Sequence, residues 1–204
     1  GKLSPRISVA SVENALNLQN YPAELHSYIA SSCIKLLGRY LSSSATNISA
    51  SLAHNIYMPH EALTIDALVK HTSELWTMAR DMRCDKISMV HDGYLKLFQL
   101  DRPTLDYDVI LFDEAQDSTQ AISSIIEAQS CSKIVVGDTH QSIYSFRNSH
   151  NALDKFNASE TLTLSKSFRF GKDIAKAANL LLSEYKYETR KIVATLQHKL
   201  KRHH

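Results

Sequence analysis

Two short, almost continuous apolar runs lie in the second half of the chain, at residues 107–112 and 133–137. Such runs are typical of strands buried on both faces of a parallel sheet, because helices cover each face of that sheet. Between them, apolar side chains recur at roughly helical spacing, at Ala121, Ile122, Ile125, Ile126 and Ala128. A strand, a helix and a second strand within about 30 residues predict a βαβ unit and an α/β fold.

Residues 1–100 have a different pattern, which predicts mainly helix. The small polar stretch 42–47 predicts a loop, and Thr64 is a suitable N-cap for a helix that places Trp76 in the core. Further along, residues 162–164 indicate a third strand and residues 172–185 another helix. The first helix is predicted from a three-and-four spacing at Leu25, Tyr28, Ile29, Cys33, Leu36, Leu37, Tyr40 and Leu41.

The composition is that of a globular protein, with 44% hydrophobic and 22% charged residues. The 23 Lys and Arg residues nearly balance the 21 Asp and Glu residues, so the net charge of +2 does not identify a nucleic-acid binder. Cys33, Cys84 and Cys131 form no CxxC pair, which favours reduced thiols in an intracellular protein over a disulfide framework or zinc finger. The sequence has no run of about 18 apolar residues, so no membrane contact is expected.

Acidic side chains follow the first apolar run directly, in the sequence Asp113-Glu114-Ala115-Gln116-Asp117. Ligands of open α/β sheets bind at the carboxyl ends of the strands, and adjacent carboxylates there are poorly explained by packing. One carboxylate can hold Mg²⁺ through water, and its neighbour can polarise an attacking water. The alternative is a solvated turn in which Asp117 caps the next helix.

A second polar segment follows the next apolar run and extends from Gly137 to Arg147. Asp138, directly after Gly137, adds a carboxylate to the same predicted sheet edge. Tyr144 and Phe146 alternate with polar residues and precede Arg147, an arrangement on which unpaired bases can stack. The alternative is that both rings are buried in the core, as aromatic rings commonly are.

A third candidate is Arg169, which lies between the aromatic residues Phe168 and Phe170. Its guanidinium could form a surface cation–π pair. It could also reach a γ-phosphate and stabilise the charge that develops in phosphoryl transfer.

Together these segments resemble, in order and in spacing, the motifs of the UvrD/Rep family of superfamily 1 DNA helicases. Residues 113–117 resemble motif II, residues 137–144 resemble motif III, and residues 167–169 resemble the arginine segment of motif IV. Two segments resemble the F-box DNA helicase branch of this family, namely residues 91–100 and the Ser-Phe-Arg-Phe-Gly sequence at residues 167–171. The resemblance covers about residues 88–185.

The resemblance implies a partial RecA-like P-loop motor domain that uses ATP and Mg²⁺. Asp113 would coordinate Mg²⁺, and Glu114 would act as the general base on the hydrolytic water. Gln141 would sense the γ-phosphate, with Asp138 in the same nucleotide-binding loop. Arg169 would approach the γ-phosphate from the second motor domain.

The resemblance also implies contacts with DNA. Tyr144 and Phe146 would stack on single-stranded DNA, with Phe146 standing where many relatives carry Trp. Arg147 would tie the motif III segment to the acidic cluster or to the strand. Gln116 and Asp117 would support the site without touching the nucleotide.

The implied domain plan has three parts, with a large helical insertion at 1–87, a RecA-like portion at 88–158 and the start of the second motor domain at 159–204. The phosphate-cradling sequence G-x-x-x-x-G-K-[ST] does not occur in these 204 residues. The chain is therefore expected to be an internal piece of an ATP-dependent 3′-to-5′ DNA helicase of repair or recombination, inactive by itself. In a eukaryote its expected location is the nucleus.

The expected partners are single-stranded DNA, duplex junctions and the remainder of the motor, with F-box ligase partners only through other segments. One alternative is a non-catalytic, helicase-derived module that binds DNA or a protein. Another is a different P-loop ATPase with a similar acidic motif, such as a nuclease-helicase. The basic stretch 186–202 could neutralise phosphates or be a solvated terminal segment.

Overall fold

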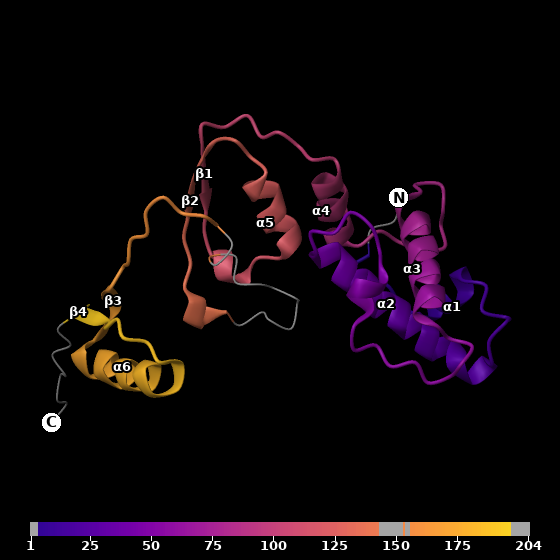
Figure 1. Cartoon of the computed structure of the whole chain (residues 1–204), viewed down its shortest axis with the longest axis horizontal. Helices are drawn as coiled ribbons and strands as arrows, with labels where there is room; N and C mark the ends of the chain where they lie inside the picture. The colour runs from indigo at the N-terminus through magenta and orange to yellow at the C-terminus, as the bar shows by residue number, and fades with distance from the viewer. Residues whose placement is uncertain (1–3, 143–152, 154–155, 197–204) are drawn as a thin grey trace, which may run out of the picture. The chain divides into compact units, whose positions relative to one another are not determined.

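The computed structural model describes residues 4–142, 153 and 156–196 of the chain (Figure 1). The chain divides into two compact units, Gly1–Phe156 and Asn157–His204. The helices of the first portion are α1 (Val9–Ala15), η1 (Ala23–Leu25), α2 (His26–Ser42), η2 (Ala50–Ala53), α3 (Ile65–Arg80) and α4 (His91–Leu100).

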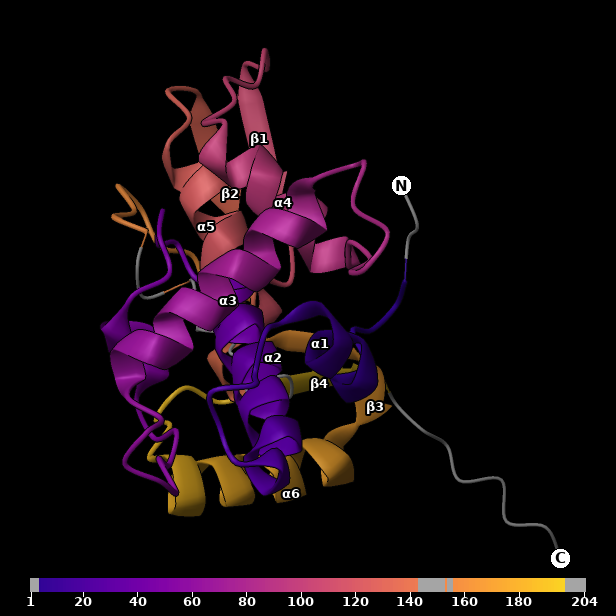
Figure 2. The ribbon, with the colours of Figure 1, turned by 90° about the vertical axis from the view of Figure 1, so that its right-hand side faces the viewer.

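Helix α2 is the centre of this helical portion. α1, α3 and α4 all contact it, and Figure 2 shows α3 running across it. The predicted first helix and the loop after it are confirmed, because α2 ends at Ser42. Trp76 is 5% exposed and meets Tyr40 edge to face, with ring centroids 5.8 Å apart, so its predicted core position is confirmed as well. All three cysteines are free thiols.

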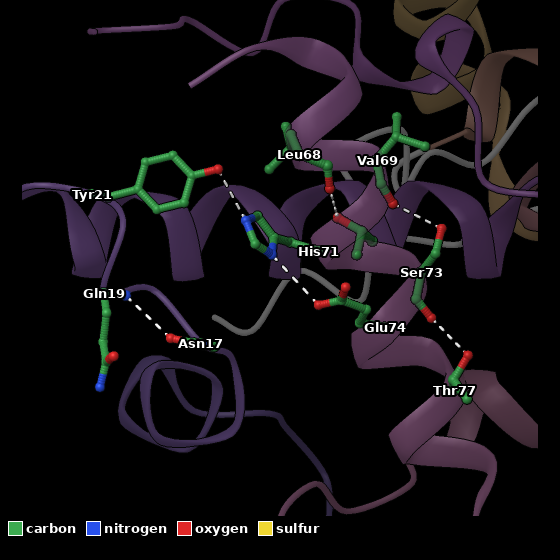
Figure 3. A network of polar contacts seen from close by, with 10 residues as sticks. Asn17, Gln19, Tyr21, Leu68, Val69, His71, Ser73, Glu74 and Thr77 are labelled. Carbon is green, nitrogen blue, oxygen red and sulfur yellow. Dashed lines mark hydrogen bonds and ion pairs between the residues drawn. The ribbon is translucent and has the colours of Figure 1, made fainter. Parts of the chain in front are cut away.

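Polar contacts join α3 to the segment before α2 (Figure 3). Tyr21 Oη and His71 Nε2 lie 3.1 Å apart, and the two rings meet edge to face. His71 Nδ1 lies 3.6 Å from Glu74 Oε2 on the next turn of α3. These contacts hold the start of the helical portion against its core.

A buried lysine connects α4 to the segment that follows α2. Lys96 has no exposed surface, and its Nζ donates to the carbonyl oxygens of Ser43 at 3.0 Å and Ala45 at 2.5 Å. The same ammonium lies 4.3 Å from the centre of the Tyr40 ring. Burial lowers the pKa of Lys96 to about 8, because desolvation disfavours its charged form.

Replacing Thr64 with alanine is expected to lower the free energy of unfolding of the first unit by about 1 kcal/mol. The Thr64 hydroxyl accepts from the Ala67 amide at 3.1 Å, as predicted for an N-cap, and alanine cannot replace this bond. Urea unfolding followed by the fluorescence of Trp76, the single tryptophan, measures the change. T77A, on the exposed side of the same helix, is the control and should stay within about 0.5 kcal/mol of the wild type. Equal losses in both variants would contradict the capping role.

The rest of the first unit contains β1 (Val109–Phe112), η3 (Ala115–Asp117), α5 (Gln120–Glu127), β2 (Ser132–Val135) and η4 (Thr139–Gln141). β1 and β2 are parallel, with Val109 opposite Ser132 and Phe112 opposite Val135. The predicted order of strand, helix and strand is therefore confirmed, as is the mixed α/β class. Helix α5 contacts α4 and α2, which connects this small sheet to the helical portion.

The prediction that these strands are buried on both faces is wrong. Leu111 is 73% exposed, and Val109 and Ile134 on the same face are also exposed. On the opposite face, Phe112 is half-buried and meets the Phe156 ring edge to face at 6.0 Å. A parallel sheet is buried on both faces only when a layer covers each of them. Within the described residues, the face of Leu111 remains open to solvent.

The second unit contains β3 (Lys166–Gly171), α6 (Lys172–Lys186) and β4 (Val193–Leu196). The two strands are parallel, and the predicted helix at 172–185 is confirmed by α6. Asn179 on α6 fixes the start of β4, because its side chain donates to Ile192 O at 2.9 Å and accepts from Ile192 N at 2.8 Å. In the part of the chain that the structure describes, no helix combines the length and apolar character needed to cross a bilayer.

The predicted strand at 162–164 is wrong. Leu162 and Leu164 are exposed, the latter to 92%, and the strand begins at Lys166. The Val193 amide donates to Ser165 O at 2.8 Å, so the pairing with β4 starts only there. The apolar residues before Ser165 belong to no strand ladder.

Candidate functional site

The loops that follow β1 and β2 lie at the same edge of the sheet, since both strands run in the same direction (Figure 1). Backbone hydrogen bonds continue the pairing beyond the strands. The Val136 amide donates to Phe112 O at 2.8 Å, and the Ala115 amide donates to Val136 O at 3.0 Å. The structure thus brings residues 113–117 beside residues 137–141.

The first loop presents two carboxylates to solvent. Asp113 and Glu114 are both exposed, and Asp113 Oδ1 accepts from the Glu114 amide at 2.9 Å. Glu114 has a left-handed backbone, with φ 52° and ψ 39°. This conformation is unfavourable for a residue with a Cβ and persists where surrounding contacts impose it.

The second loop is organised by Asp138. Its Oδ1 accepts from the His140 amide at 2.9 Å, and its Oδ2 accepts from Gln141 Nε2 at 2.6 Å. The backbone N–H of Gln141 also donates to the backbone carbonyl oxygen of Asp138 at 3.0 Å. The Asp138 carboxylate therefore caps the short helix η4 and orients the exposed Gln141 side chain.

Gln116 connects the two loops. Its side chain is 1% exposed, its Nε2 donates to Glu114 Oε2 at 2.5 Å, and its Oε1 accepts from the Asp138 amide at 3.0 Å. Ser142 Oγ adds a 3.3 Å hydrogen bond to the Gln116 carbonyl oxygen. The sequence placed Gln116 in a supporting position but did not indicate that it spans both loops.

The other predicted site residues lie elsewhere. Asp117 is half-buried in η3, and the next helix, α5, is capped by Thr119, which accepts from the Ile122 amide at 3.4 Å. The alternative in which Asp117 caps that helix is therefore wrong. Arg169 is an exposed residue of β3 in the second unit. The three predicted DNA-binding residues lie outside the described residues: Tyr144, Phe146 and Arg147.

The carboxylates of the first loop suit a Mg²⁺ ion better than a transition metal. Mg²⁺ is usually held by one or two carboxylates together with waters and substrate phosphates, and Asp113 and Glu114 provide exposed oxygen ligands of that kind. Across residues 4–142, 153 and 156–196, no group of three or more His, Cys, Asp or Glu side chains could hold a metal by itself.

Comparison with known proteins shows which class of proteins this part of the chain is similar to. Residues 100–159 match the family model of the UvrD/REP helicase N-terminal domain, so this part of the chain is similar to that domain. No solved structure matches the chain.

Two curated relatives are both named as F-box DNA helicases. F-box DNA helicase 1 of Gallus gallus is 43% identical over 118 residues, which make up 56% of this chain and 12% of the relative. F-box DNA helicase protein 1 of Schizosaccharomyces pombe is 32% identical over 199 residues, which make up 89% of this chain and 23% of the relative. The resemblance to the F-box DNA helicases is confirmed, although the chain spans less than a quarter of either relative.

Proposed function

We propose that this chain supplies the carboxylate half of the ATPase site in an ATP-dependent 3′-to-5′ DNA helicase with a RecA-like motor fold. Residues 1–87 would form its helical insertion, residues 88–158 part of the first motor domain, and residues 159–204 the start of the second. The names of the relatives support DNA as the substrate. A nuclear role in repair or recombination is part of the proposal.

The observation that carries this proposal is the joined pair of loops at the carboxyl edge of β1 and β2. Nucleotide-binding α/β proteins place their phosphates at such an edge. Asp113 would hold Mg²⁺, which neutralises the charge on the phosphates of ATP when bound. Glu114, one residue further, would orient the attacking water and accept its proton.

The second loop would sense the nucleotide. Gln141 is exposed on η4 and oriented by Asp138, so its amide could turn toward a γ-phosphate. Asp138 would contribute to nucleotide binding by holding the Gln141 side chain in this orientation. Arg169 would complete the charge stabilisation from the second motor domain, where a guanidinium can pair with phosphate oxygens in a fixed geometry.

The proposed DNA contact is tested by replacing both Tyr144 and Phe146 with alanine. Stacking contributes about 1–3 kcal/mol per base, so the affinity for a single-stranded oligonucleotide is expected to fall by at least about tenfold. Fluorescence anisotropy with a labelled oligonucleotide at fixed salt measures this affinity. Y57A removes an exposed tyrosine from the helical portion and serves as the control. Unchanged binding in Y144A/F146A would count against the stacking surface.

A further inference from the structure

The side chain of Gln116 is the most deeply buried polar group at the candidate site. A buried amide is unfavourable unless both its donor and its acceptor are hydrogen-bonded. Here the donor is directed to the Glu114 carboxylate and the acceptor to the Asp138 amide. Because the two partners need opposite ends of the amide, these contacts define its orientation.

The surrounding backbone is built closely around this amide. A Cβ on Gly137 would lie 2.5 Å from Gln116 Oε1 and 3.3 Å from the Ala115 nitrogen. Both distances are shorter than ordinary van der Waals contacts. Gly137 is therefore needed because the second loop passes so near to the Gln116 side chain.

We propose that Gln116 is a positioning residue that makes the loops after β1 and β2 move as one. Its single amide sets the direction of the Glu114 carboxylate and the start of the Asp138–Gln141 turn together. A displacement of one loop is then transmitted to the other through two hydrogen bonds. This inference rests on the proposed function, in which Glu114 handles water and Gln141 senses phosphate.

The test exchanges the hydrogen-bonding groups without changing their size. Q116E removes the donor to Glu114 and places two carboxylates against each other. Their repulsion displaces the side chain of residue 116, which weakens its hydrogen bond from the Asp138 amide. In the double variant E114Q/Q116E, residue 114 becomes the donor and residue 116 accepts from both sides, which restores both bonds. The readout is the hydrogen-exchange rate of the Asp138 amide, measured by NMR on the 204-residue chain.

We expect exchange at Asp138 to accelerate by about tenfold in Q116E, the size of one lost hydrogen bond. In E114Q/Q116E it should return to within about twofold of the wild type. A residue that only fills volume would give no such rescue. If Q116E does not fold, the test relies on the double variant E114Q/Q116E. That variant is expected to fold and to show wild-type exchange at Asp138 only if the two hydrogen bonds between the loops are restored.

Q129E is the matched control. Gln129 is also a buried glutamine with both amide ends bonded, but its partners are Pro103, Leu105 and Ile125, away from the site. Q129E should leave the hydrogen-exchange rate of the Asp138 amide at its wild-type value, once any change in the global stability of the chain is taken into account. Wild-type exchange in Q116E, no rescue in the double variant, or an equal effect of Q129E would each overturn the proposal. The exchange experiment uses no nucleotide, so its outcome does not depend on ATP hydrolysis. Absence of ATP turnover in the helicase would contradict the proposed function but not the coupling of the two loops through Gln116.

Discussion

Replacing Glu114 with glutamine is expected to lower ATP turnover by the proposed helicase motor by a factor of about 10² to 10⁴. Glutamine keeps the size of the side chain but cannot accept the proton of the attacking water. Because Asp113, the proposed Mg²⁺ ligand, is retained, binding of Mg-ATP should change little. Steady-state phosphate release gives kcat and KM, and the expected change lies almost entirely in kcat.

The measurement needs a version of the protein in which a phosphate-binding loop precedes this segment, because the 204 residues contain none. E127Q is the matched control, since Glu127 is exposed at the end of α5 within the same βαβ unit. It should retain wild-type kcat. The 204-residue chain alone is expected to hydrolyse ATP at the background rate. DNA-stimulated turnover by this chain, abolished in E114Q, would contradict the proposed division of the site.

Local sequence pattern was sufficient to predict the βαβ unit and several helices. The two apolar runs and the helical spacing between them depend on residues that are close together in the chain. The cap of α3 is equally local, since Thr64 bonds an amide three positions away. The common edge of residues 113–117 and 137–141 followed because parallel strands end on the same side.

Burial could not be predicted in the same way, because it depends on which elements cover a strand. A continuous apolar run indicates that β1 can be covered on both faces, yet Leu111 is exposed. Leu164 is also apolar, but the position of Val193 determines that pairing starts at Ser165. In both cases the deciding partner lies elsewhere in space and has no signature in the local sequence.

The bridging contacts of Gln116 and the burial of Lys96 had no sequence signal for the same reason. The Asp138 amide that Gln116 bonds is 22 positions away, and the carbonyl oxygens that Lys96 bonds are 51 and 53 positions away. A lysine on a helix is usually at the surface with its charge in water. Only the packing of α4 against α2 reveals that this one is buried.

Lys96 should give the chain a distinctive pH dependence of stability. Its pKa is lowered from the ordinary value of 10.5 to about 8 by burial in the folded chain. Between these values the unfolded chain still binds a proton that the folded chain has released, so the free energy of unfolding rises with pH. Relative to K96M, which has no titrating group there, the wild type is expected to gain about 3 kcal/mol over this range, at about 1.4 kcal/mol per pKa unit.

Urea unfolding of both chains at pH values from about 7 to 10, followed by Trp76 fluorescence, measures this difference. Trp76 packs against Tyr40, whose ring contacts the Lys96 ammonium, so the probe reports on the same part of the molecule. Cys33, whose pKa burial raises to about 11, makes stability fall above its ordinary pKa, but it is present in both chains and cancels in the comparison.

K35M is the matched control, because Lys35 lies on the exposed side of α2. The difference in free energy of unfolding between the wild type and K35M should not rise with pH as the difference between the wild type and K96M does. Above pH 8 the neutral Lys96 amine can still donate to the carbonyl oxygens of Ser43 and Ala45, so the gain does not require the helical portion to rearrange. A wild-type minus K96M difference that stays flat or falls with pH would contradict the lowered pKa of Lys96. An equal rise in the wild-type minus K35M difference would show that the rise does not come from Lys96.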